Sequence, residues 1–181
     1  MTEQEIIQWA LEEGFSAAAI VDTDQIVFDP SFRPYCAENL CGQYGANYSC
    51  PPDCGSPEEM KQRILNHKKA LVLQSIWQVA DYGDTVAIKQ AKKGHNAAEV
   101  RLVKRLRSAG CDGLIVGASG CALCNPCKQT LGEPCSFPDL KYSCMSAYCI
   151  FVKKLTDACG LEYDSGEGIV NFLGMYVFEE K

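Results

Sequence analysis

The sequence has little histidine and none of the short motifs that mark the common enzyme classes. Only two of its 181 residues are histidine, His67 and His95. It contains no Ser–His–Asp candidate, no Walker A glycine loop and no Gly-x-Gly-x-x-Gly turn. The sequence therefore gives no signal for a serine hydrolase, a P-loop nucleotidase or a Rossmann-type dinucleotide enzyme.

The chain also lacks the signals of membrane insertion or export. No apolar run approaches the roughly 20 residues that a membrane-spanning helix needs. Residues 1–5, Met-Thr-Glu-Gln-Glu, are acidic where a signal peptide would be basic, and no apolar stretch follows them. We expect a cytoplasmic protein without a membrane partner.

Excess positive charge is absent too. The net charge is −6, from 17 basic and 23 acidic residues. Basic residues gather in two stretches, 61–69 and 89–107, but both have helical character and are most simply explained as solvated helix faces. Because the overall field repels phosphate, we expect no nucleic-acid partner.

What the sequence does have is cysteine, 12 residues of it. Its length fits a single domain over residues 1–181, large enough for a hydrophobic core, so a disulfide-stapled miniprotein is excluded. The cytosol keeps thiols reduced, and clustered thiolates there are ligands for soft metals. The composition therefore indicates metal binding.

Apolar periodicity predicts helices and strands that alternate along the chain, which favours an α/β domain. Two irregular cysteine-rich loops, 29–54 and 119–138, each follow a predicted strand, so an open α/β sheet would place both at one edge. The predicted helices cover 3–13, 57–67, 84–108 with a break at Gly94, and one or two within 139–158, and the predicted strands cover 17–21, 70–77, 114–118 and 169–178.

The loop at 119–138 carries the sharper motif. Cys121, Cys124 and Cys127 follow one another at two-residue gaps, and Cys135 comes after Pro134. Bacterial ferredoxins use the same triple start, with a more distant fourth cysteine, to hold a [4Fe–4S] cluster. Zinc sites usually separate two Cys-x-x-Cys pairs, so zinc is the weaker alternative.

The loop at 29–54 contains Cys36, Cys41, Cys50 and Cys54, at a less distinctive spacing. Pro51 and Pro52 would stiffen it. We expect a second [4Fe–4S] cluster here, with zinc as the alternative. An exchange of the fourth ligand between the two loops also stays open, since ferredoxins do this.

Four cysteines lie outside both loops. Cys111 and Cys159 flank apolar elements and are expected to be small buried hydrophobic residues. Cys144 and Cys149 could instead replace a ligand or form a reversible disulfide. His95, at an expected helix start, is a weaker candidate for contact with a metal or substrate.

Two blocks of sequence resemble a known family. Residues 41–52 resemble the pattern Cys-x-x-Tyr-Gly-x-x-x-x-Cys-Pro-Pro, and residues 120–138 carry the cysteine run ending in Gly-Glu-Pro-Cys-x-x-Pro. Both are typical of the uncharacterised family of predicted metal-binding proteins known as domain of unknown function 2284, and the likeness extends over about 33–178. It implies metal binding and no established reaction. The chain departs from it at 144–151, where Cys144 and Cys149 replace family residues and acidic positions are lost.

The leading hypothesis is an electron-transfer accessory that carries two clusters and docks on a redox partner protein. An enzyme is the first alternative, with one cluster iron free to bind substrate near His95 or Tyr44. The second is a zinc-bound structural or interaction module, in which the metal only folds the loops.

Overall fold

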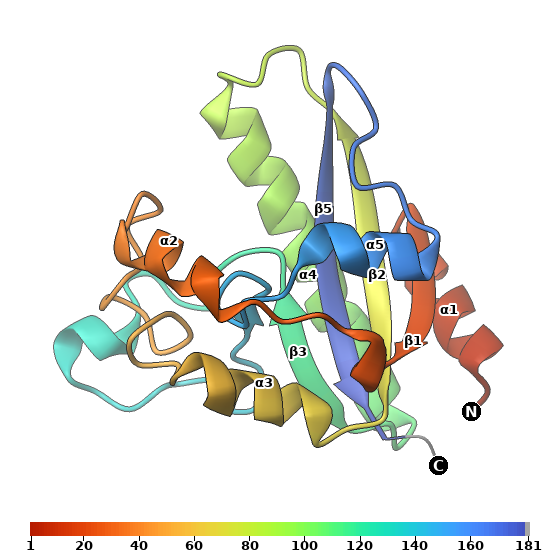
Figure 1. Cartoon of the computed structure of the whole chain (residues 1–181), viewed down its shortest axis with the longest axis horizontal. Helices are drawn as coiled ribbons and strands as arrows, with labels where there is room; N and C mark the ends of the chain where they lie inside the picture. The colour runs from red at the N-terminus through yellow and green to blue at the C-terminus, as the bar shows by residue number, and fades with distance from the viewer. Residues whose placement is uncertain (180–181) are drawn as a thin grey trace.

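The structure, a computed structural model, describes residues 1–179 and is built on one mixed sheet (Figure 1). The strands lie in the order β1-β2-β5-β3-β4, and every pairing is antiparallel except the short parallel pair β3–β4. The strands are β1 (Ala17–Asp22), β2 (Lys69–Gln78), β3 (Gly113–Gly117), β4 (Ser143–Cys144) and β5 (Ile169–Phe178).

Helices cover both faces of this sheet. Helices α1 and α4 pack on one face, and α3 and α5 pack on the other beside the cysteine loops (Figure 1). The helices are α1 (Glu3–Glu12), α2 (Arg33–Ala37), α3 (Pro57–Leu65), α4 (Thr85–Ser108) and α5 (Val152–Cys159). Across residues 1–179, none of the helices combines the length and apolarity that crossing a membrane requires. The predicted α/β fold class is confirmed.

Strand β2 is a nearly unbroken apolar run because both of its faces are buried. Ala70 and Val72 face the core beneath α3 and α5, whereas Leu71 and Leu73 face the core beneath α1 and α4. All four side chains are 0% exposed. Each buried leucine stabilises the fold by about 1.5–3 kcal/mol. The strand predicted at 70–77 is confirmed, and it is a central strand covered on both sides.

Two local predictions were wrong. Helix α4 continues through Gly94. The glycine leaves room for the Trp77 ring, which lies 3.3 Å from where a Cβ would be. Most of 139–151 forms turns and β4 rather than helix, and within 139–158 only α5 is helical. Ile150 forms a bridge with Phe28, which draws this segment away from helical geometry.

The expectation that an open α/β sheet places both cysteine loops at one edge was also wrong, because β1 and β3 run in opposite directions. In the antiparallel register Asp22 pairs with Lys69, Lys69 with Phe178, and Phe178 with Gly113. Strand β1 therefore ends at the same end of the sheet at which β3 begins. The two loops therefore leave the sheet at opposite ends of its strands. They meet only because the first loop crosses the face of the sheet.

Helices α1 and α3 each begin with a capping box, and the one at α3 gives a direct stability test. The Ser56 side chain accepts from the Glu59 backbone N–H at 3.2 Å, and the Glu59 carboxylate accepts from the Ser56 N–H at 2.8 Å. Ser56→Ala is expected to lower the free energy of unfolding by about 1 kcal/mol, since it leaves a helix N–H unpaired. Urea unfolding measures this. Ser56→Asn, which can still cap, should stay close to wild type, and equal losses in both variants would contradict the assignment.

Candidate metal centre

The two cysteine loops pack against each other. The Asn47 side-chain amide donates to the Cys121 carbonyl at 2.8 Å, and the Tyr48 hydroxyl donates to the Glu133 carbonyl at 2.8 Å. The Cys50 sulfur lies so close to Gly120 that a Cβ there would be 2.9 Å from it. Residues about 75 positions apart in the sequence thus form one cysteine-rich region, beside α2 and α3 in Figure 1.

The first thiol group gathers all four predicted cysteines of the first loop and one more from β4. Burial, together with its thiol neighbours, raises the pKa of Cys50 to about 12. Burial also raises the pKa of Cys54, whereas the nearby guanidinium groups of Arg33 and Arg63 lower it. The members of this first thiol group are Cys36, Cys41, Cys50, Cys54 and Cys144.

The second thiol group comes from the second loop. Burial raises the pKa of Cys121, the backbone N–H groups of Leu123 and Tyr142 lower it, and the thiols of Cys124 and Cys135 raise it further. Three predicted ligands are therefore electrostatic neighbours. The sulfurs of Cys121 and Cys135 face backbone N–H donors, as thiolate ligands of metals do.

Cys127 and Cys135, in the second half of the second loop, are held by hydrogen bonds to residues close in sequence. The Cys135 sulfur accepts a hydrogen bond from the Phe137 N–H at 3.4 Å. Cys127 comes directly before the 3-10 turn Lys128–Leu131, and its carbonyl accepts from the Thr130 hydroxyl at 2.8 Å. The hydrogen bond that the Lys128 ammonium donates to the Glu133 carboxylate raises the pKa of Lys128, and the charge of Cys124 raises it further. A cation thus stands beside this thiol group.

The donor set of both groups consists of thiols, which suits soft metals and iron–sulfur clusters. Between residues 1 and 179, no three Cys, His, Asp or Glu side chains converge closely enough to hold one metal ion. The thiols form the two wider groups described above.

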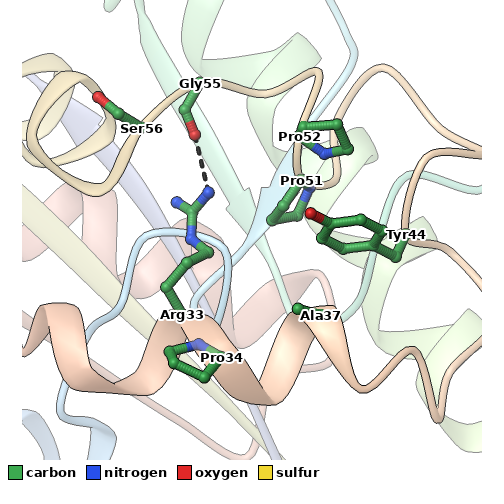
Figure 2. Close-up of a pocket in the computed structure, with 8 residues that line it drawn as sticks. All are labelled: Arg33, Pro34, Ala37, Tyr44, Pro51, Pro52, Gly55 and Ser56. Carbon is green, nitrogen blue, oxygen red and sulfur yellow. Dashed lines mark hydrogen bonds between the residues drawn. The ribbon is translucent and has the colours of Figure 1, made fainter.

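A hollow of about 530 Å³ opens beside the first thiol group (Figure 2). The Arg33 guanidinium lines it and donates to the Gly55 carbonyl at 2.8 Å and to the Ala147 carbonyl at 2.7 Å. Figure 2 shows the Tyr44 ring across the hollow from Pro34 of α2. Its walls are mostly apolar, so it could accept the apolar part of a small molecule.

His95 is not part of either thiol group. It lies in the core between α4 and the sheet, 1% exposed, with its Nδ1 2.8 Å from the Ser75 hydroxyl. The Phe15 ring meets it edge-on, and burial lowers its pKa to about 4. The prediction that His95 contacts a metal or substrate is therefore not supported.

Three cysteines lie outside both thiol groups. Cys111 is buried beside α4, and Cys159 packs against the core on the α5 side, where burial raises its pKa to about 11. Both agree with the expected apolar role. Cys149 is buried beside the first thiol group and has a φ of 56°, a conformation that favours glycine.

A mixed α/β domain with two cysteine loops packed against each other is the architecture of a cysteine-rich metal-binding protein. Within that class, the chain belongs to the family described as "Predicted metal-binding protein (DUF2284)", which matches residues 19–178. No curated protein and no solved structure matches it.

Proposed function

We propose that this chain is an iron–sulfur protein that carries two [4Fe–4S] clusters and transfers electrons as a redox accessory in the cytoplasm. One observation carries the proposal: Cys121, Cys124 and Cys135 of the second loop form a thiol group that lies directly against the first thiol group. When bound, the clusters would accept and pass on single electrons. The protein would hold them side by side and tune their potentials.

The surroundings of the sulfurs support this proposal. Cys121 has two backbone N–H neighbours, from Leu123 and Tyr142, and Cys135 has one, from Phe137. Hydrogen bonds of this kind stabilise the negative charge on cluster ligands and set the reduction potential. Cys50 is buried and Cys121 is half-buried, which lowers the local dielectric and strengthens both effects.

Exposed apolar side chains on both loops support a protein redox partner. Leu40 is 90% exposed on the first loop, and Leu131 is 57% exposed on the second. Tyr35 and Phe137 are also exposed beside the thiol groups. Aromatic and aliphatic anchors close to a cluster would shorten the electron path to a docked partner.

Anaerobic purification followed by iron and sulfide analysis tests the proposal. About eight irons and eight sulfides per chain are expected from two four-iron clusters. Cys124→Ala should reduce both by about half, because it removes a ligand at the centre of the second loop. The control Cys159→Ala, outside both thiol groups, should keep the wild-type content. Zinc alone in the wild-type protein would exclude the proposal and favour a zinc-bound structural module.

The hollow beside the first thiol group favours one second candidate, an enzyme whose cluster has an iron free for substrate. Tyr44 lines that hollow and could contact a bound molecule, whereas His95 is buried elsewhere. Substitution of each cysteine in turn distinguishes the two. If each cluster needs four cysteines, no iron is free and this candidate fails.

A further inference from the structure

The hollow beside the first thiol group has the volume and the walls of a small-molecule site. Its volume of about 530 Å³ falls within the range of about 300–1,000 Å³ that is typical of ligand pockets. Its walls are mainly apolar: the Tyr44 ring, Pro51 and Pro52 of the first loop, and Pro34 and Ala37 of α2 (Figure 2). None of the described residues that line it is a cysteine, so a bound molecule would lie against these walls and not on a sulfur.

Among the described residues that line the hollow, Arg33 alone is charged. Its guanidinium donates to two neutral acceptors, the Gly55 and Ala147 carbonyls, and within residues 1–179 it forms no ion pair with a carboxylate. Each Nη nitrogen uses one of its two N–H groups in these bonds, so one on each remains for a ligand. The Cys36 and Cys54 thiols are near this charge, but neither belongs to the lining. The hollow therefore contains a cation that no protein carboxylate compensates.

The walls of the hollow are held in place by the protein itself. The Tyr44 N–H donates to the Asn39 side-chain oxygen at 2.9 Å, and the Gly45 N–H donates to the Pro51 carbonyl at 2.9 Å. Proline also fixes its own backbone torsion, which stiffens the wall further. Because these segments have little conformational freedom left to lose, a small molecule can bind here at a low cost in entropy.

The lining favours a carboxylate over a phosphate group. A phosphate has three acceptor oxygens and up to two negative charges, so it needs several donors. Here a single guanidinium meets the hollow, and three of the eight lining residues are prolines, which have no backbone N–H. The planar fork of an arginine matches the two oxygens of one carboxylate. The ring face of Tyr44 in turn suits a flat apolar body.

We infer that the hollow binds a small organic acid, whose carboxylate pairs with the Arg33 guanidinium and whose flat apolar body lies against Tyr44 and Pro51. The inference goes beyond the proposed function, because it does not depend on the metal that the thiol groups hold and needs no free iron. The lining comes from α2, from residues 44–52 and from the residues before α3, and each of these segments carries a cysteine of the first thiol group. A bound acid would therefore bridge the segments that surround that group.

Isothermal titration of the full-length protein, purified anaerobically, with 2-naphthoate and with 2-naphthamide tests the inference. The two probes have nearly the same shape, and only 2-naphthoate carries a charge. We expect 2-naphthoate to bind at least about tenfold more tightly, because a hydrogen bond to a charged partner is much stronger than one between neutral groups. Acetate has the carboxylate without the apolar body and should bind at least about tenfold more weakly than 2-naphthoate.

Three variants locate the binding. Arg33→Gln should remove the preference for the charged probe, so that the two affinities agree within about twofold. Tyr44→Ser should weaken the binding of both probes by about three- to tenfold and keep the preference. Arg63→Gln is the matched control: its guanidinium would lie 3.1 Å from a Cβ on Gly55 but does not line the hollow, so the wild-type affinities should remain. Circular dichroism establishes which variants are folded.

Four results would overturn the inference. They are no measurable binding of 2-naphthoate, equal affinities of the wild-type protein for 2-naphthoate and 2-naphthamide, wild-type affinity for 2-naphthoate in folded Arg33→Gln, and a loss of affinity in Arg63→Gln as large as that in Arg33→Gln. Should Arg33→Gln not fold, Tyr44→Ser decides, because unchanged affinity there would place the probe outside the hollow. Zinc in place of iron in these preparations would refute the proposed function and leave this comparison valid, so the two failures are distinguishable.

Discussion

A Glu99→Gln protein is expected to lose less stability than the wild-type protein as the pH rises above about 6.5, because one proton retained on folding costs the wild-type protein at most about 1.4 kcal/mol per pH unit. Glu99 lies on α4 and is 1% exposed. Burial raises the pKa of its carboxyl well above the ordinary 4.5, although the Met175 backbone N–H opposes the rise. The folded state therefore keeps a proton that the unfolded chain releases, and folding becomes less favourable as the pH increases.

His95 determines where this loss begins. Burial lowers its pKa from 6.5 to about 4, so the unfolded chain binds its proton first as the pH falls. The stability that depends on neutral His95 is present above about pH 6.5 and is lost toward pH 4. Between about pH 4.5 and 6.5 the two residues act with opposite sign and similar slope. We therefore expect a nearly level region there, and the loss due to Glu99 above it.

The geometry explains why both residues keep their perturbed state. His95 and Glu99 are one helical turn apart and face the same point of β5: a Cβ on Gly174 would lie 2.8 Å from the His95 Nε2 and 3.0 Å from a Glu99 oxygen. Neither the Nε2 nor either carboxylate oxygen has a hydrogen-bond partner of regular geometry among the described residues. A charge on either side chain would thus be poorly compensated.

Urea unfolding at about pH 5.5, 7 and 8.5 measures the effect, because the slope per pH unit follows from proton linkage. The thiols titrate in both proteins, so their contribution cancels in the difference between Glu99→Gln and wild type. Glu167→Gln, at an exposed position, is the matched control and should follow the wild-type profile. Parallel curves for Glu99→Gln and wild type would show that Glu99 is ionised in the folded protein.

Gly113→Ala is expected to destabilise the protein by about 3 kcal/mol, the upper part of the range for overpacking. A Cβ at Gly113 would overlap the backbone carbonyl oxygen of Val177 and lie 2.9 Å from the Tyr176 ring. Neither can move away easily. The Tyr176 hydroxyl donates to the Cys111 carbonyl at 2.8 Å, and the Gly113 carbonyl accepts from Arg107 at 2.9 Å.

The strain would fall on the contact between β3 and β5, which positions the start of the second cysteine loop. Thermal unfolding of the variant should show a clear fall in the midpoint. Gly83→Ala is the control, since a Cβ there would meet only the exposed carboxylate of Asp81, at 3.2 Å. A Gly113→Ala protein as stable as Gly83→Ala would mean that β3 and β5 are less closely paired than described here.

Much of the local structure could be predicted from the sequence. The capping boxes at Thr2 and Ser56, and the central strand at 70–77, depend on residues that are close together along the chain. The eight loop cysteines could also be recognised, because cluster motifs are local spacings. Glu99 was visible as an acidic residue on the apolar face with Leu102 and Leu106, but its burial needed the sheet to be placed first.

The sequence by itself determined a mixed α/β domain with two cysteine-rich loops, since helical periodicity, apolar runs and ligand spacing are properties of neighbouring residues. Only the tertiary structure decided the antiparallel strand order, the contact between the loops, the place of Cys144 beside Cys36, and the burial of His95 with Glu99. The physical reason is that strand pairing and packing depend on contacts between distant segments. Their free energy is the sum of many small terms that no local pattern records.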